Sequence, residues 1–171
     1  MYQEKEEVHD IETLIRKYGN DVLRTAYMYV KDSHLAEDIF QDVFIKVNQK
    51  LHTFQGDSNI KTWIIRITIN TCKDYMKSAW NQKVMQFTEV HENTLTGKDE
   101  FVAVEQEDEN RLVRDAVIQL PQKYKDVLLC VYFQDMSVAE TAKLLGIAEG
   151  TAKSRLSRAK DKLKLSLEGR I

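Results

Sequence analysis

The stretch that decides the fold of this chain runs from Ser137 to Leu163 and reads SVAETAKLLGIAEGTAKSRLSRAKDKL. Ser137 is placed to cap a short helix, and Glu140 three residues later completes a capping box. Gly146 is placed to end that helix, and a second helix follows from Gly150. The second helix would bury residues spaced four, three and four apart, namely Ala152, Leu156, Ala159 and Leu163. The pattern predicts a helix-turn-helix.

The opposite face of this last helix is basic, with small residues near its centre. Small residues let a helix enter a major groove, and flanking arginines and lysines then reach phosphates or base edges. The candidate DNA-contacting residues are Thr151, Lys153, Ser154, Arg155 and Arg158. Because the N-terminal half of such a helix normally lies deepest, we predict that Arg155 reads bases and Arg158 holds a phosphate. An ordinary amphipathic helix with a solvated basic face is the alternative.

Composition and charge agree with a helical, DNA-binding chain. Of 171 residues, 43% are hydrophobic, and a single proline and six glycines leave few helix breakers. The net charge is only −2, but the charges are unevenly distributed along the chain. From Thr151 onward there are seven basic residues and two acidic ones, whereas nine acidic residues lie between Glu89 and Asp115. A chain with such segregated charge can bind DNA while being acidic overall.

Other classes of protein are disfavoured. No apolar run is long enough for a transmembrane helix, and the acidic start MYQEKEEVHD does not look like a secretory signal. Cys72 and Cys130 lie in apolar surroundings without neighbours at metal-ligand spacing, so we expect buried, reduced thiols. We therefore predict a cytoplasmic protein without direct membrane insertion, without a metal and without a cofactor.

The N-terminal half predicts helices over residues 11–30 and 35–51, and a third from 60 to about 80. The third is locally ambiguous, since IIRITINT alternates like a strand. On a helical wheel, however, four polar residues fall within about 60° of one another. These are Arg66, Asn70, Lys73 and Lys77, which form a basic stripe. The stripe favours a helix buried on most sides with one wet, basic face.

The remaining segments complete an all-α fold of two small helical domains joined by a flexible linker. Residues 1–80 form the first domain, 81–111 an acidic linker of weak periodicity, and 112–171 the helix-turn-helix domain. Within the second domain we expect a helix from 109 that stops at Pro121, and then helices over 124–134, 137–145 and 150–167.

The C-terminal motif closely resembles the promoter-binding domain of extracytoplasmic-function sigma factors. It has their Leu120-Pro121 step, their Leu145-Gly146-Ile147 turn and their Gly-Thr-x-Lys-Ser-Arg-Leu-x-Arg-Ala run from Gly150 to Ala159. The resemblance implies that this domain, called region 4 in the family, reads the −35 promoter element.

The N-terminal domain resembles region 2 of the same family. AEDIFQDVFIKV, residues 36–47, looks like the helix that docks on the largest polymerase subunit, which implies a core polymerase-binding role for Asp38, Gln41 and Asp42. Trp63, Asn70 and Asp74 match the reader of the −10 element. The resemblance implies that a flipped base enters a pocket in the preceding loop and that the stripe holds phosphates. The implied −10 residues are Phe54, Ser58, Asn59, Trp63, Arg66, Asn70, Lys73 and Lys77.

The resemblance implies a sigma factor that binds core RNA polymerase and directs it to promoter DNA, in a stress or envelope-signal response. An anti-sigma factor is the usual further partner in the family. Two alternatives are a plain helix-turn-helix regulator and a nucleic-acid enzyme. The first would carry a receiver or ligand-binding domain, and the N-terminal half lacks the strand–helix alternation of a receiver. For the second, the four histidines are scattered and there is no phosphate-binding glycine loop, so we assign no catalytic residue.

Overall fold

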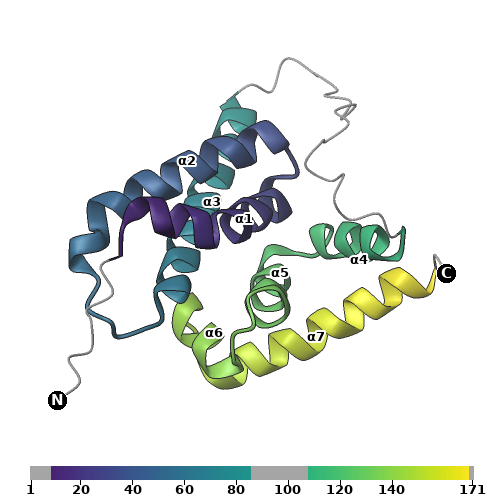
Figure 1. The fold of residues 1–171 in the computed structure, drawn as a ribbon. Coiled ribbons are helices and arrows are strands. Elements are labelled where there is room, and N and C mark those ends of the chain that lie inside the picture. Colours follow the sequence, from purple (N-terminus) through teal and green to yellow (C-terminus); the bar gives the residue numbers. More distant parts are fainter. Residues whose placement is uncertain (1–8, 86–107, 170–171) are drawn as a thin grey trace.

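The computed structural model describes residues 9–85 and 108–169, and within these ranges the chain forms helices and no strands (Figure 1). The N-terminal part consists of α1 (Ile11–Val30), α2 (Ser33–Lys50), a single 3₁₀ turn η1 (Leu51–Thr53) and α3 (Ile60–Met85). The C-terminal part consists of α4 (Asp108–Ile118), α5 (Gln122–Leu128), a π-helical turn η3 (Leu129–Phe133), α6 (Val138–Leu145) and α7 (Glu149–Glu168). The predicted all-α class is confirmed. Most of the predicted acidic linker lies outside the described residues.

The segment that alternates like a strand is helical, as predicted from the stripe of Arg66, Asn70, Lys73 and Lys77, which we now call the α3 stripe. Its buried threonines are accommodated because their hydroxyls donate to carbonyls one turn earlier, Thr68 to Ile64 at 2.9 Å and Thr71 to Ile67 at 2.7 Å. Ile64, Ile65 and Ile69 are all buried. The helix also continues to Met85, beyond the end expected near residue 80.

The N-terminal part is a bundle of α1, α2 and α3 around one apolar core. Asp32 is the N-cap residue of α2, and its side chain accepts a hydrogen bond from the Leu35 backbone N–H at 3.0 Å. Gly19 lets α1 and α2 approach closely, because a Cβ there would meet the Phe40 ring at 3.3 Å. The two helices predicted over residues 11–30 and 35–51 are therefore closely packed.

The helix-turn-helix is built as the sequence predicts. The Ser137 side chain accepts from the Glu140 N–H at 3.1 Å, and the Glu140 carboxylate accepts from the Ser137 N–H at 2.9 Å. Gly146 ends α6 in the left-handed conformation, with φ +67°. A small separate core then holds α5 against α7, formed by Leu120, Tyr124, Val127, Leu128 and Ala159.

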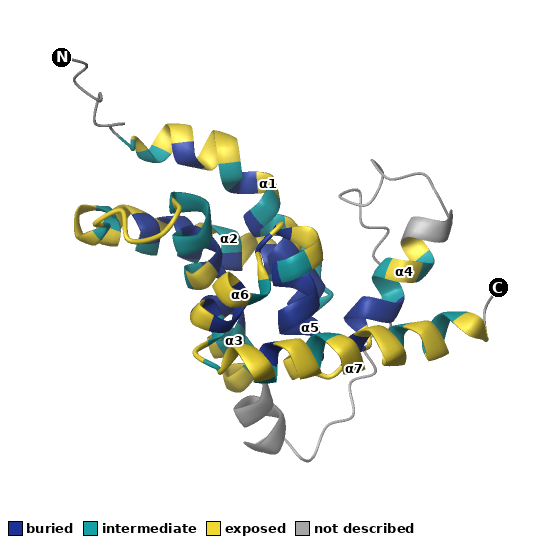
Figure 2. Cartoon of the chain, turned by 90° about the horizontal axis from the view of Figure 1, so that it is seen from below, coloured by how far each residue is buried: buried dark blue, intermediate teal, exposed yellow. Residues whose placement is uncertain are grey.

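The two parts are docked against each other in this structure. One continuous cluster of buried residues includes the core of the three-helix bundle and also six C-terminal side chains, namely Val117, Ile118, Leu129, Cys130, Met136 and Leu144. Figure 2 shows α5 in the middle of the molecule as a mostly buried helix, while α7 runs along the outside and is mostly exposed. The fold thus places the second domain directly over part of the first.

Candidate functional site

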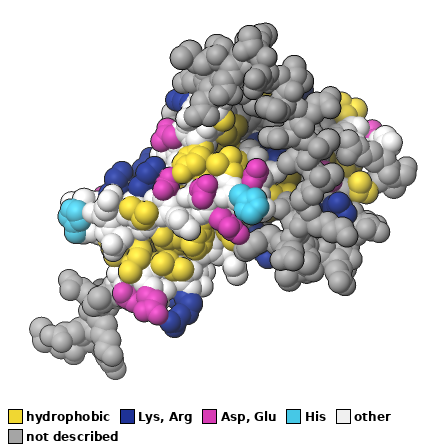
Figure 3. Space-filling view, turned by 90° about the horizontal axis from the view of Figure 1, so that it is seen from above, with side chains coloured by type: hydrophobic (Ala, Val, Ile, Leu, Met, Phe, Trp, Pro, Cys, Tyr) yellow, Lys and Arg dark blue, Asp and Glu magenta, His cyan; other side chains and the backbone are white. Residues whose placement is uncertain are grey.

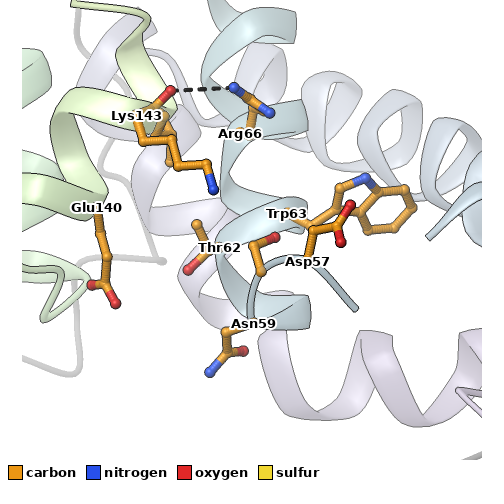
Figure 4. A pocket seen from close by; sticks show the side chains of 9 residues that line it. Asp57, Asn59, Thr62, Trp63, Arg66, Glu140 and Lys143 are labelled. Atoms are coloured by element: carbon orange, nitrogen blue, oxygen red, sulfur yellow. Dashed lines mark hydrogen bonds between the residues drawn. The ribbon is translucent and has the colours of Figure 1, made fainter. Parts of the chain in front are cut away.

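A cleft of about 160 Å³ lies where the loop before α3 faces α6. Figure 4 shows its side chains, which come from both parts of the chain. The N-terminal part supplies Asp57, Ser58, Asn59, Thr62, Trp63 and Arg66, and α6 supplies Glu140, Lys143 and Leu144. The structure therefore brings together Ser58, Asn59, Trp63 and Arg66, which the sequence analysis grouped as candidates for base and strand binding.

Local chemistry positions the N-terminal wall of this cleft. The Asn59 side chain accepts from the Lys61 N–H at 2.9 Å and so caps the start of α3. Gly56 turns the loop with φ +77°, a conformation that side chains rarely adopt. Phe54 packs on Trp63 with ring centroids 5.4 Å apart, and so supports the indole. The indole is thereby held half-buried at the cleft.

The α3 stripe is only partly open to solvent. Asn70 and Lys77 are exposed. Arg66 is exposed as well, but its Nη2 donates to the Lys143 backbone carbonyl at 3.3 Å. The Lys73 side chain is 30% exposed, and its Nζ lies 3.0 Å from Asp126 Oδ2. Two of the predicted phosphate-binding side chains thus contact the C-terminal part of the chain.

Asp126, on α5, is the centre of a polar cluster that sequence reasoning missed. Its side chain is 7% exposed, and its second oxygen accepts from the buried Tyr29 hydroxyl on α1. Burial and the nearby Asp126 carboxylate raise the pKa of Tyr29 well above its usual range. Beside this pair, Gln134 Nε2 donates to Thr25 Oγ1 at 2.9 Å. We call Thr25, Tyr29, Lys73, Asp126 and Gln134 the interdomain polar cluster.

On α2, the structure separates the three candidate polymerase-binding residues. Asp38 and Gln41 are exposed on the outer face, which also carries Ile45 with 54% exposure. Figure 3 looks onto this side of the molecule, where acidic side chains lie among hydrophobic ones. Asp42 instead is half-buried and accepts from the Tyr75 hydroxyl of α3. That hydrogen bond, more than burial, raises the pKa of Tyr75 to about 12.

The five candidate residues of the helix-turn-helix lie together on α7. Lys153, Ser154 and Arg158 are exposed, and Thr151 and Arg155 are half-buried. The Ser154 hydroxyl donates to the Thr151 carbonyl at 3.0 Å, which keeps this position compact. We call these five residues the α7 face. The Lys153 ammonium lies 3.5 Å from the Glu149 carboxylate one turn earlier on the same helix.

The remaining expectations concern cysteines, metals and membranes. Cys72 and Cys130 are free and buried, as predicted, and burial raises the pKa of each thiol to about 12. Among the residues that the structure describes, no cluster of His, Cys, Asp and Glu is suited to hold a metal ion. Within the same ranges, none of the helices has the length and apolar character needed to cross a bilayer.

Comparisons with known proteins agree with this architecture. Residues 14–82 match Sigma-70 region 2, and residues 110–163 match Sigma-70 region 4. The chain is 31% identical over 140 residues to RNA polymerase sigma factor SigZ of Bacillus subtilis, covering 82% of this chain and 77% of the relative. It is 29% identical to ECF RNA polymerase sigma factor SigM of Mycobacterium tuberculosis, covering 88% and 73%.

A solved structure has the same fold. It is the sigma factor RpoE in complex with the anti-sigma factor NepR from Bartonella quintana, with a TM-score of 0.75, 21% identity, and coverage of 96% of this chain and 100% of that one. The helical architecture, the two matched regions and the sequence relatives together define the class. This chain belongs to the extracytoplasmic-function (ECF) family of RNA polymerase sigma factors.

Proposed function

We propose that this sigma factor binds core RNA polymerase through α2, reads the −10 element at the cleft and the α3 stripe, and reads the −35 element with the α7 face. The domain limits that we propose are 1–80 for the first unit, 81–111 for the linker and 112–171 for the second. In this proposal the chain is not an enzyme and acts in the cytoplasm. It recognises DNA and polymerase, and the polymerase carries out the chemistry.

The observation that carries the proposal is the grouping of Ser58, Asn59 and Trp63 at one cleft, at the end of a basic stripe. An aromatic side chain and polar groups in a cleft suit an unstacked base, and cations alongside suit the strand's phosphates. On α2, the exposed Asp38 and Gln41 suit a basic partner helix.

We also propose an anti-sigma factor as a partner. The support is the solved relative with the same fold, which was captured with its anti-sigma factor NepR. Such a partner would keep the chain from polymerase until a signal releases it, consistent with a stress or envelope-signal response.

The experiment that tests the function is run-off transcription. The purified chain is added to core polymerase on a library of promoter fragments, and the transcribed fragments are sequenced. We expect the selected fragments to share one upstream and one downstream element. A lack of selected fragments, or tight specific binding of the free chain to duplex promoter DNA, would instead support an ordinary repressor or activator.

A further inference from the structure

Three aromatic rings from three segments of the N-terminal part meet at the loop before α3. Phe54 is the middle ring, with its centroid 5.4 Å from that of Trp63 and 5.9 Å from that of His9. Phe54 and Trp63 were predicted as −10 residues from the family resemblance, whereas His9 belongs to none of the motifs. We call His9, Phe54 and Trp63 the ring cluster, and it extends beyond the residues of the proposed −10 site.

The backbone on either side fixes where the two outer rings of this loop stand. His9 immediately precedes Asp10, the N-cap residue of α1, whose carbonyl accepts from the Leu14 N–H at 3.0 Å. Leu14 is 2% exposed, so the first turn of α1 is anchored in the core. The Phe54 N–H donates to the Leu51 carbonyl at 3.1 Å, at the end of η1. Figure 1 shows the start of α1 beside the loop that leads into α3.

The ring cluster keeps aromatic surface open to solvent. His9, Phe54 and Trp63 are each half-buried. The His9 and Phe54 rings meet at an interplanar angle of 72°, which is an edge-to-face contact. In such a contact one ring presents its edge and keeps both faces outside the contact, and the other ring keeps one face. The cluster therefore offers aromatic faces in addition to that of Trp63.

The surroundings of the ring cluster favour a nucleobase as its ligand. Unpaired bases stack on aromatic side chains, including histidine, and this stacking is tolerant of sequence. The loop from residue 55 to residue 59 is polar and exposed, which suits a solvated strand better than an apolar partner helix. Trp63 belongs both to the cleft and to the cluster. A strand with one base at the cleft therefore brings its next base to the cluster.

We propose that His9 and Phe54 form a second stacking subsite, which takes the unpaired base next to the one held at the cleft. The ligand is a nucleobase of a single DNA strand, bound by stacking and not by hydrogen bonds to its edge. The proposal rests on the proposed function, which places the strand at the cleft. It extends that function to a residue outside the −10 motifs and makes the segment before α1 part of the strand-binding surface.

The test combines variants of His9 with the removal of single bases from the DNA. Holoenzyme assembled from core polymerase and the full-length chain is bound to a promoter fragment recovered by run-off selection, with its downstream element held open by mismatches. Each unpaired nucleotide of the non-template strand is replaced in turn by an abasic nucleotide, and fluorescence anisotropy gives the affinity. Circular dichroism verifies that each variant is folded.

Four variants separate the ring of His9 from its bulk. His9→Leu keeps an apolar side chain against Phe54 and removes the ring, whereas His9→Phe restores an aromatic ring. His52→Leu is the matched control, because His52 is an exposed histidine of η1, next to the same loop. Trp63→Ala is the reference for the base at the cleft.

In the parent we expect two adjacent abasic positions to weaken binding, each by about fivefold. His9→Leu should weaken binding of the intact fragment by about fivefold and be insensitive to one of these two positions, because the stacking contact with that base is already lost. Trp63→Ala should be insensitive to the other position. His9→Phe and His52→Leu should behave as the parent does. A purely structural role of His9 would instead weaken binding of every fragment alike.

The inference is overturned if both positions remain sensitive in His9→Leu, or if His9→Phe behaves as His9→Leu does. Failure of the proposed function has a different signature. In that case no promoter fragment is selected, or Trp63→Ala keeps the affinity of the parent for every fragment. A loss confined to Trp63→Ala would keep the proposed function and remove the second subsite.

Discussion

The two basic surfaces of this protein differ in what lies over them. The α3 stripe has two of its four members in contact with the second domain, whereas Lys153, Ser154 and Arg158 of the α7 face are exposed. In the proposed function both surfaces contact promoter DNA, yet only the α3 stripe contacts the second domain in this structure. The difference teaches that side chains of the α3 stripe have partners within the chain that those of the α7 face lack in common, and mutations in the two surfaces should therefore behave differently.

The largest effect is expected on the open surface. An arginine that contacts guanine through both donors contributes about 1–3 kcal/mol of discrimination, or roughly fivefold to 150-fold. We expect Arg155→Ala to relax the preference among promoters that differ only at −35, measured by run-off transcription. Arg158→Ala should instead weaken all of these promoters alike and lower the salt slope by about one unit.

If instead Arg158→Ala relaxes the preference among −35 sequences and Arg155→Ala weakens all promoters alike, the two assignments are reversed. The proposal that α7 reads the −35 element would still stand. Unchanged transcription in both variants would remove −35 reading from α7 altogether. Lys160→Ala provides a control on the same helix, since Lys160 lies over the Tyr132 ring, 5.3 Å from its centroid, and is outside the α7 face.

A smaller effect is expected on the covered surface, and it should depend on which residue is changed. Asn70→Ala with Lys77→Ala removes two exposed members of the stripe. We expect this double variant to lower the permanganate reactivity of promoter thymines by several-fold, because each lost phosphate contact weakens strand binding. Normal promoter opening in this double variant would show that the exposed part of the stripe is only a solvated face.

Asn70→Ala with Lys73→Ala sharpens the comparison, because this pair also removes a partner of Asp126. If the ion pair of Lys73 with Asp126 holds the domains together, the free protein should become less compact in this second double variant and remain compact in the first, as small-angle X-ray scattering would show. Equal compactness in both would argue that Lys73 does not hold the domains together.

How much of this could be predicted from the sequence depends on how local each signal is. The cap from Ser137 to Glu140, the turn at Gly146 and the helical periodicity of α3 involve residues a few positions apart, so pattern alone predicts them. These predictions succeed because backbone geometry fixes which neighbouring side chains share a face. The set that includes Ser58, Asn59 and Trp63, which lie at one cleft, came instead from the resemblance to region 2 of the family.

The docking of the domains could not be predicted in this way. Asp126 meets Tyr29 from 97 positions away, and Gln134 meets Thr25 from 109 positions away. In sequence, Asp126 looks like an ordinary polar residue of an amphipathic helix. The helix predicted over 124–134 is α-helical only as far as Leu128 and continues as a π-helical turn over Leu129–Phe133, which the apolar pattern did not distinguish from an α-helix. The family resemblance also grouped Asp42 with Asp38 as polymerase-binding residues. In the structure, however, Asp42 accepts a hydrogen bond from the Tyr75 hydroxyl of α3.

Within α2 the same contrast between open and covered residues predicts two kinds of defect. Asp38→Lys reverses an exposed charge and should weaken binding to core polymerase with little change in the free energy of unfolding. Asp42→Asn weakens the hydrogen bond from Tyr75 and should lower that free energy by about 1 kcal/mol. Competition for core polymerase and urea unfolding measure the two effects. Gln49→Ala, at an exposed position of α2 outside the proposed polymerase-binding residues, serves as an uncharged control. Normal binding by Asp38→Lys would contradict the docking assignment for α2.

The smallest expected effect is on pH dependence, and it comes from Lys125, which is buried where α5 faces α1. Burial, together with the like charge of Lys31, lowers the pKa of Lys125 to about 8, although the adjacent Asp126 acts in the opposite direction. Its ammonium lies 5.8 Å from the centroid of the Tyr29 ring. In the unfolded chain the lysine returns to its usual pKa near 10.5, so between these two values the unfolded state binds more protons than the folded one.

The free energy of unfolding should therefore rise as the pH is raised above 8, by less than about 1 kcal/mol up to pH 9. Above pH 9 the free energy of unfolding should fall again. The buried thiols of Cys72 and Cys130 have pKa values raised to about 12. They therefore stay protonated in the folded state while they ionise in the unfolded state, which favours unfolding. Urea unfolding of the parent and of Lys125→Met at pH 7.5, 8.5 and 9.5 checks both parts. We expect the substitution to abolish the rise and to leave the decline above pH 9 intact. If the free energy of unfolding still rises above pH 8 in Lys125→Met, the rise comes from another titrating group. The burial of Lys125 between α5 and α1 would then have no part in the pH dependence.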